Sequence, residues 1–403
     1  MGSTLIVSLF VIGNIVGSGF FIMPSLMASL GSNLVYSWVI GCSMALIFAL
    51  IFGRLYLMFP KVSVLSDYFE HSTIKKMVSW VYWISCVISN TGILIVLVGT
   101  LNIKNANLLA VILMGILTIS NSIVRYHTVE KIETLLTVLK FSILVILPIG
   151  FFMWKPDIFV VPPQMGSSSE IATLGISSFW AFIGIETAAL FGSGKSARRG
   201  LLLGVIACSI LYISSSLFLA GSVPLDELQK SSSPFSLLAR EYVGVGSEKY
   251  MSFLIAFTSF GALYGWVAAT GKMSLLFAES KLFGSVFLAK TPSANSNFGL
   301  WSSSAITSLI FFAVSNLNIN DQFAFVSNIC IYVTLFIYAM CSYVVVRKSG
   351  TVIPKILGVL GMLIVIGSFL LSWKMLIITF MVLIFVYSLV FLVNLNDKKK
   401  LTK

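Results

Sequence analysis

Long apolar stretches joined by short polar connections run through the whole chain. The stretches lie at 4–31, 33–58, 77–103, 107–124, 132–154, 171–193, 200–222, 250–279, 298–317, 322–346, 352–371 and 373–394. Each is close to or longer than the roughly 20 residues that a helix needs to cross a bilayer, and tilting or a break accommodates the longer ones. The pattern therefore predicts an all-α membrane protein with twelve transmembrane helices and no soluble domain.

Glycines interrupt the first stretch near its middle, in the sequence Gly13-Asn14-Ile15-Val16-Gly17-Ser18-Gly19. Each glycine costs a helix interior about 1 kcal/mol, and backbone freed from the helix cannot face lipid unsatisfied. We therefore expect a broken helix, in which the N–H groups of a second half-helix and the Ser18 hydroxyl form a site for a carboxylate. The alternative is a seam of small residues for close helix packing.

Glu186 is the one acid at the middle of a stretch, while the others fall in loops or at the ends of stretches. An ionisable residue at this depth marks a substrate or proton pathway by default. Gly184 and Thr187 lie beside it and favour a second break in the sixth stretch. The alternative is a protonated Glu186 that only bonds neighbouring helices.

Two lysines also fall inside stretches. Lys140 lies well inside 132–154, where its ammonium could replace a sodium ion, release a proton during transport, or snorkel to the inner surface. Lys272 lies in the inner half of 250–279, where snorkelling is the simpler interpretation.

Two tryptophans stand out from the lipid-facing aromatic residues. Trp180 lies within two turns of Glu186, and Trp266 is flanked by small residues, Gly261, Ala262 and Gly265. An indole face beside a lone carboxylate suits a cation. The alternative for each indole is packing.

Composition agrees with a membrane protein. The 403 residues are 58 % hydrophobic and 10 % charged, whereas soluble domains have about a quarter charged residues. The net charge of +12 comes from lysines and arginines scattered through short loops without interleaved aromatic residues, which argues against nucleic acid as a partner. Alternate loops receive 18 and 6 of these residues, so the positive-inside rule places both termini in the cytoplasm.

No catalytic or metal-binding pattern is present in the sequence. The five cysteines lie in apolar stretches without CxxC spacing, and the two histidines, His71 and His127, lie in separate loops. An intramembrane enzyme needs a clustered nucleophile and base or metal ligands, and a channel needs repeated polar stripes or charged rings. We therefore expect no cofactor and no metal, and both classes remain remote alternatives.

The glycine motif of the first stretch and Trp180-Ala181-Phe182-Ile183-Gly184-Ile185-Glu186 in the sixth resemble the amino acid–polyamine–organocation transporters. The nearest branch is the bacterial basic amino acid/polyamine antiporters, such as the arginine/agmatine and putrescine/ornithine exchangers. The resemblance covers nearly the whole chain. It implies a five-plus-five inverted repeat with broken first and sixth helices in a core over 1–346, and two accessory helices and a basic tail over 347–403. No such repeat is readable from the sequence itself.

The resemblance also implies roles for individual residues. Ile15, Ser18 and Gly19 match the segment that holds the substrate carboxylate, and Asn14 matches a polar contact beside it. Trp180 and Ile183 match residues that cradle the substrate chain and its amino group. Trp266 matches an indole under the distal cation, Asn90 an amide contact and Tyr82 a gate. Glu186 matches an acid linked to proton sensing or cation binding.

Two departures from the family pattern affect mechanism. The inner loop Pro60–Tyr68 lacks the family's double glycine, so no inner-gate or pH-sensing tyrosine is assigned there. Lys140 matches a lysine of proton-coupled relatives, where the arginine/agmatine exchanger has a small apolar residue.

The expected function is exchange of a cationic amino acid (arginine, ornithine or lysine) for a polyamine or related amine in the bacterial inner membrane. The alternative is proton-coupled amino acid symport through Lys140. The homodimer common in the family is left open.

Overall fold

The computed structural model describes residues 2–60, 62, 64–124, 135, 145, 149–150, 153–190 and 194–401, and nearly all of its regular structure is helical. Within these residues, ten helices are long and apolar enough to cross a membrane, or up to eleven if the bent first pair is one span. Most of the predicted stretch 132–154 falls outside the described residues. The all-α membrane fold is therefore confirmed, whereas the count of twelve stays a prediction.

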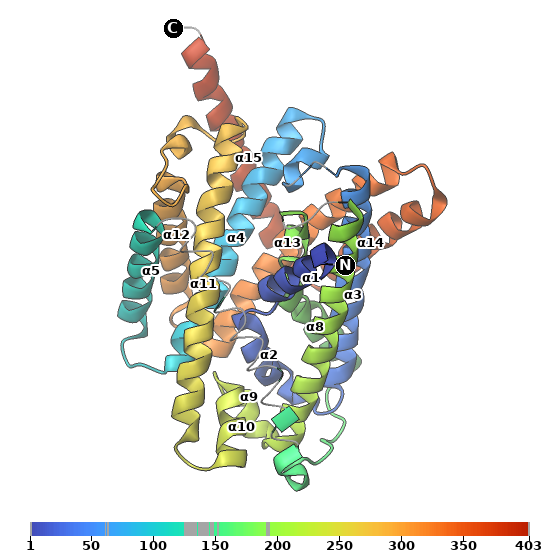
Figure 1. The fold of residues 1–403 in the computed structure, drawn as a ribbon, viewed down its shortest axis with the longest axis vertical. Coiled ribbons are helices and arrows are strands. Elements are labelled where there is room, and N and C mark those ends of the chain that lie inside the picture. The colour runs from blue at the N-terminus through green and yellow to red at the C-terminus, as the bar shows by residue number, and fades with distance from the viewer. Residues whose placement is uncertain are drawn as a thin grey trace.

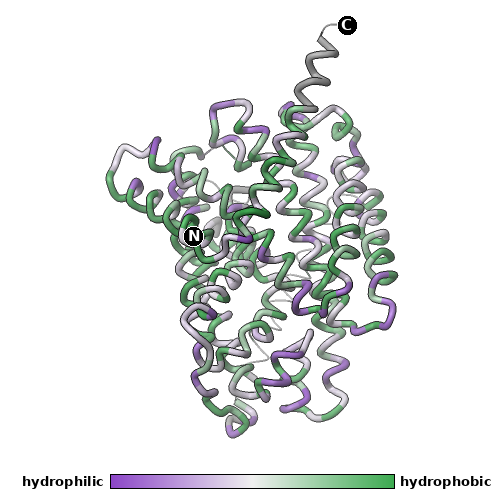
Figure 2. The backbone as a smooth tube through the Cα atoms, turned by 180° about the vertical axis from the view of Figure 1, so that it is seen from behind, coloured by the Kyte–Doolittle hydropathy of each residue, from purple (hydrophilic) through white to green (hydrophobic). Residues whose placement is uncertain are grey.

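Nine unbroken helices overlap predicted stretches. They are α3 (Leu34–Met58), α4 (Ser72–Leu101), α5 (Ala106–Ile123), α8 (Gly194–Ser222), α11 (Ser247–Glu279), α12 (Asn297–Val314), α13 (Ile319–Lys348), α14 (Val352–Leu371) and α15 (Trp373–Leu401). Hydrophobic residues dominate the lengths of these helices, and hydrophilic residues gather in the loops at both ends (Figure 2).

The first stretch is broken where its glycines predict. It consists of α1 (Gly2–Ile15), α2 (Ser18–Met27) and a 3₁₀ turn, η1 (Ala28–Leu30), and its two halves meet at 57°. Gly17 between them is extended, with φ −115° and ψ −174°. The i to i+4 ladder is lost at this point, which leaves polar backbone groups for other partners.

The sixth stretch is also broken. It begins as α7 (Ser168–Ser178), tightens into η4 (Phe179–Phe182), and resumes after Gly184 as η5 (Ile185–Leu190). Gly184 has a φ of +111°, a conformation that glycine adopts without a steric penalty. The second predicted break is therefore confirmed and lies immediately before Glu186.

The two breaks lie in the middle of the bundle. In Figure 1, α5, α11 and α12 stand on one side, α3 and α8 on the other, and α1, α2 and α13 between them. In the most apolar segment of α4, 89 % of the residues are buried, whereas the shares in the corresponding segments of α14 and α15 are 22 % and 17 %. Hence α4 is a central helix, and α14 and α15 are peripheral.

Two of the longer connections carry short helical segments. The connection between α8 and α11 contains α9 (Leu225–Lys230) and α10 (Pro234–Val243). The described part of the connection between α3 and α4 contains a 3₁₀ turn, η2 (Leu65–Tyr68).

Candidate functional site

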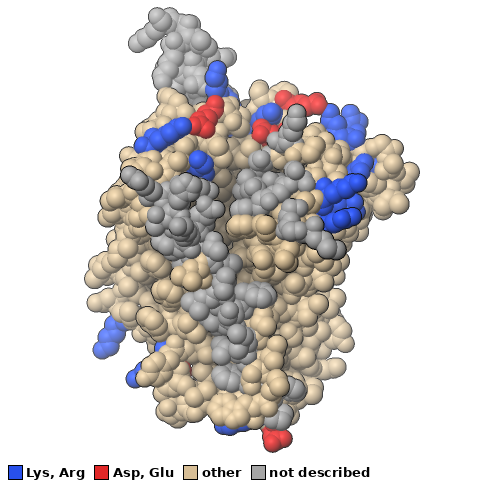
Figure 3. All heavy atoms as spheres, viewed as in Figure 1, with Lys and Arg blue, Asp and Glu red and all other residues tan. Residues whose placement is uncertain are grey.

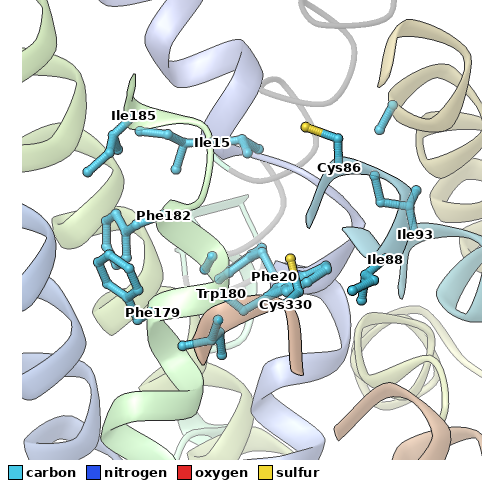
Figure 4. Close-up of a cluster of buried hydrophobic side chains, with 14 of the residues drawn as sticks. Ile15, Phe20, Cys86, Ile88, Ile93, Phe179, Trp180, Phe182, Ile185 and Cys330 are labelled. Carbon is cyan, nitrogen blue, oxygen red and sulfur yellow. The ribbon is translucent and has the colours of Figure 1, made fainter. Parts of the chain in front are cut away.

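Side chains link the two helix breaks directly. The Asn14 amide nitrogen, in the last turn of α1, donates to the Thr187 hydroxyl at 2.8 Å, and that hydroxyl donates to the Gly184 carbonyl at 2.6 Å. This chain of hydrogen bonds fixes the end of α1 against the turn that opens η5. Figure 4 shows Ile15 and Ile185 meeting from the same two segments.

A small pocket opens between the two breaks and α4. Its cavity volume is about 30 Å³, room for water but not for an amino acid, so a substrate enters only if lining side chains move. The lining consists of Asn14, Ile15, Gly17, Gly19, Phe20, Ser89, Ile93, Trp180, Ala181, Ile183 and Trp266. Six of these were predicted from the sequence as substrate-binding residues: Asn14, Ile15, Gly19, Trp180, Ile183 and Trp266.

The Trp180 indole packs against glycines on two helices, α2 and α4. A Cβ added at Gly19 would lie 1.9 Å from Trp180 Nε1, and one added at Gly92 would lie 2.8 Å from the far edge of the ring. Phe323 of α13 meets the ring edge-on, with centroids 5.5 Å apart. The indole, 6 % exposed, is therefore held by close backbone approach on two sides.

Trp266 of α11 forms another wall of the pocket and is only partly buried. A Cβ at Gly184 would lie 3.3 Å from its ring, so the left-handed glycine of the second break packs close to this indole. Two indoles thus border the pocket, from the sixth span and from α11. Aromatic faces of this kind attract a desolvated ammonium or guanidinium group.

The start of α2 offers backbone donors to the same pocket. Gly17, the residue before α2, lines the pocket, and no side chain of the described residues caps this helix end. The first N–H groups of an uncapped helix and its dipole favour an anion such as a carboxylate. The side chain of Ser18 is outside the described part of the structure, so its predicted contact stays a prediction.

Glu186 lies behind the pocket in a cage of tyrosines. Its Oε1 accepts from the Tyr82 hydroxyl at 2.8 Å, and its Oε2 accepts from the Tyr338 hydroxyl at 2.5 Å and the Gly184 N–H at 3.1 Å. The Tyr56 hydroxyl donates to the Glu186 carbonyl at 2.9 Å. None of the ion pairs between described residues includes Glu186. Glu186 is 4 % exposed, and the hydrogen-bond donors to its carboxyl group are all neutral.

The remaining predicted residues lie outside the pocket lining. The Asn90 amide nitrogen donates to the Thr270 hydroxyl, 3.3 Å away, while its buried amide oxygen has no hydrogen-bond partner among the described residues. Tyr82, predicted as a gate, uses its hydroxyl to hold Glu186. Lys140 falls outside the described residues. The substrate, gate and proton-coupling roles of these residues stay predictions.

Sequence reasoning missed two groups of residues. Ser89 and Ile93 line the pocket from α4 and are spaced four apart, a helical spacing that continues back through Tyr82 and could have identified this face. Tyr56 and Tyr338 carry no such local signal, because a tyrosine in an apolar stretch is equally compatible with packing or with the membrane interface.

Comparison with known proteins agrees with these features. A family model described as amino acid permease matches residues 3–401. The putrescine transporter PotE of Haemophilus influenzae is 23 % identical over 363 residues, which cover 85 % of this chain and 83 % of that protein. The arginine/ornithine antiporter of Pseudomonas aeruginosa is 26 % identical over 305 residues, 67 % of this chain and 62 % of that protein. The cadaverine/lysine antiporter of Escherichia coli is 21 % identical over 368 residues, 84 % and 82 % of the two chains.

These relatives are transporters, which supports a non-enzymatic protein at the level of the family. Their names give a polyamine, two basic amino acids, or one of each as the transported compounds. Because the family model covers almost the whole chain, the protein belongs to the amino acid permease family, in the basic amino acid and polyamine branch of the amino acid–polyamine–organocation superfamily.

Proposed function

We propose that the protein is an antiporter that exchanges a cationic amino acid (arginine, ornithine or lysine) for a polyamine or related amine by alternating access. The observation that carries the proposal is the pocket between the two breaks, which combines two indoles with a helix N-terminus that no described side chain caps. The helix end suits the carboxylate of an amino acid, and the indoles suit a cation. A polyamine, which lacks the carboxylate, would use the indoles alone.

In this proposal each of the residues predicted from the sequence has one task, whether it lines the pocket or lies beside it. Ile15, Ser18 and Gly19 hold the carboxylate with Asn14 beside them, and Trp180 and Ile183 contact the substrate chain and amino group. Trp266 lies under the distal cation, and Asn90 adds an amide contact. Glu186 tunes the site from behind through the tyrosines that bind it. Tyr82, whose hydroxyl binds Glu186, is the proposed gate.

We also propose the five-plus-five inverted repeat. Each of α3, α4 and α5 packs against the helix five spans later, α8, α11 and α12 respectively. The remaining contacts also occur in matching pairs. Helix α1 packs against α8, and α7 packs against α3. Helix α4 packs against α12, and α5 packs against α11. A two-fold relation between the halves would produce this pattern. The core then spans 1–346, and 347–403 holds the peripheral α14 and α15.

The proposed location is the bacterial inner membrane with both termini in the cytoplasm. On the face drawn in Figure 3, charged residues gather toward the two ends of the long axis, and lysines and arginines are most numerous toward the end from which α15 projects. The positive-inside rule makes that end cytoplasmic.

Counterflow tests the proposed exchange. Proteoliposomes loaded with unlabelled arginine, agmatine, ornithine, lysine or putrescine should take up the labelled partner, and unloaded proteoliposomes should not. Liposomes without protein and proteoliposomes loaded with alanine serve as controls. Absence of counterflow with every cationic compound would contradict the proposal.

A further inference from the structure

Tyr212 of α8 connects the two helix breaks from a position outside the pocket lining. Its side chain is fully buried, and its hydroxyl lies 3.1 Å from the carbonyl oxygen of Ile15 and 3.3 Å from that of Ala181. Ile15 ends α1, and Ala181 lies in the tightened turn before Gly184. One side chain therefore reaches backbone from both broken spans.

The two carbonyls need such a donor. Carbonyl groups at a helix end or in a break lack the N–H group that a continuous helix would supply, and a buried carbonyl without a partner is costly. A tyrosine hydroxyl has a single proton to donate, so Ile15 and Ala181 share it. A shift of either carbonyl away from Tyr212 changes the bond that the other can make.

The ring of Tyr212 reinforces this link through packing. It stacks on Phe20 of α2, with centroids 4.5 Å apart and planes at 17°. It meets Phe182, at the end of η4, edge-on at 5.4 Å. The ring thus touches the first turn after one break and the turn just before the other, and α8 itself packs against α1, α2 and η5.

We propose that Tyr212 is a positioning residue that couples the two breaks, so that they open and close as one unit. The consequence for transport rests on the proposed exchange function. Tyr212 does not line the pocket, so its hydroxyl should influence the conformational step more than substrate affinity. Loss of one net hydrogen bond corresponds to a change of about three- to tenfold in an equilibrium or rate.

Tyr212→Phe is the informative variant because it removes the hydroxyl and keeps the ring. Tyr332→Phe is its matched control. Tyr332 is also buried, and its hydroxyl donates to the Ser368 carbonyl at 3.1 Å, but it links α13 to α14 at the periphery. A general cost of removing a buried tyrosine hydroxyl should therefore appear equally in both variants.

Amide hydrogen exchange over residues 12–20 and 178–188 tests the coupling without any substrate. We expect Tyr212→Phe to speed exchange in both segments about three- to tenfold and Tyr332→Phe to leave both unchanged. Unchanged exchange in Tyr212→Phe, or equal acceleration in the two variants, overturns the coupling. If Tyr212→Phe does not fold, hydrogen exchange in the wild-type protein tests the coupling. Equal opening rates of the two segments support the proposal that the breaks open together, and different rates contradict it.

Transport measurements then separate this inference from the proposed function. We expect Tyr212→Phe to lower the maximal exchange rate about three- to tenfold while Kd for the transported cation changes less than twofold. A changed Kd with an unchanged rate overturns the coupling. If hydrogen exchange responds as expected but the wild-type protein exchanges no cationic substrate, the coupling stands and the proposed function falls.

Discussion

The two helix breaks solve the same problem, exposed backbone in the middle of a membrane protein, in different ways. The first break is made of glycines, and no described side chain caps the N-terminus of α2 that follows it. The sixth break is enclosed by side chains: Thr187 holds the Gly184 carbonyl, and Glu186 accepts the Gly184 N–H and two tyrosine hydroxyls. The backbone N–H groups of the first break are therefore open toward the pocket, whereas the polar backbone groups of the sixth break are paired with side chains of the protein.

This difference suits the two segments to different functions. Backbone donors without internal partners are available to a ligand, so the first break is the better place to bind a substrate carboxylate. A segment whose polar groups are already paired is better suited to hold a shape and to respond when one of the partners changes. Substitutions at the first break should therefore block the site, and those at the sixth should alter its control.

Gly19→Ala should have the largest effect. The new Cβ would lie 1.9 Å from Trp180 Nε1, so the indole must leave its seat, which Gly92 closes on the other side. Overpacking of this kind costs about 1–3 kcal/mol, and we expect exchange in proteoliposomes to fall about 100-fold.

Two glycine variants control for this prediction. Gly115→Ala, in α5, should transport normally, because no atom of the described residues lies within 4 Å of the new Cβ. Gly17→Ala should lose less than Gly19→Ala, because among the described residues its Cβ would meet only the Ile15 carbonyl, at 3.8 Å. Equal loss at Gly17 and Gly19 would show that the chain needs flexibility here and not room for the indole.

The position of both breaks was predictable because the signal is local. Gly13, Gly17 and Gly19 weaken one short segment of helix, and Gly184 lies next to the single mid-span acid. The indoles at 180 and 266 were identified in the same way, as unusual neighbours of small or charged residues. Such features need no knowledge of which helices pack together.

Glu186→Gln should have the next largest effect. The carboxyl group receives Tyr82 and Tyr338 on different oxygens, and an amide offers only one acceptor oxygen in their place. Leaving a buried tyrosine hydroxyl without its acceptor costs about 1–3 kcal/mol, so we expect exchange to fall about 30-fold. Because the amide cannot gain or lose a proton, any dependence of exchange on pH that arises from Glu186 should disappear in this variant. A wild-type pH profile in this variant would remove Glu186 from proton sensing.

The tyrosine partners of Glu186 could not be predicted in this way. Tyr56 and Tyr338 lie 130 and 152 residues from Glu186 along the chain, and their hydroxyls meet it only because α3 and α13 pack around the sixth span. The same holds for Tyr212, whose two carbonyl acceptors lie in different spans. Nothing in the local sequence distinguishes these tyrosines from the others in apolar stretches.

Trp266→Leu should affect binding more than turnover. Leucine keeps apolar bulk but loses the aromatic face, a loss of up to about 2 kcal/mol for a desolvated cation. We expect KM for a cationic substrate to rise about tenfold with little change in maximal rate. Trp301→Leu, at a ring 49 % exposed on α12, is the control and should behave as wild type. An unchanged KM in Trp266→Leu would mean that this indole only packs.

Thr187→Val should give a smaller loss. It removes the hydroxyl that joins Asn14 to the Gly184 carbonyl, although the Thr187 N–H still donates to that carbonyl at 3.0 Å. Loss of roughly one net hydrogen bond predicts about a fivefold fall in exchange rate. Thr173→Val, which removes an exposed hydroxyl bonded to Ser169 in α7, should not change the rate. If both variants transport equally well, the chain from Asn14 to Gly184 does not order the breaks.

Lys140→Ala should have the smallest effect on exchange, and it tests whether the open break needs a cation of its own. If the ammonium replaces a sodium ion and cycles its charge, proton-driven net uptake should disappear in the variant while equilibrium exchange persists. If the protein is an exchanger, the wild type should show no net uptake without counter-substrate, and exchange in the variant should stay within about twofold, since a snorkelling lysine contributes little to the site.

A pH-sensitive dye inside vesicles without counter-substrate separates the two cases. Acidification of the lumen during uptake by the wild type, lost in Lys140→Ala, would replace exchange by proton symport. The glycine break would then depend on a charge from the fifth span, and the contrast between an open first break and a satisfied sixth break would no longer hold.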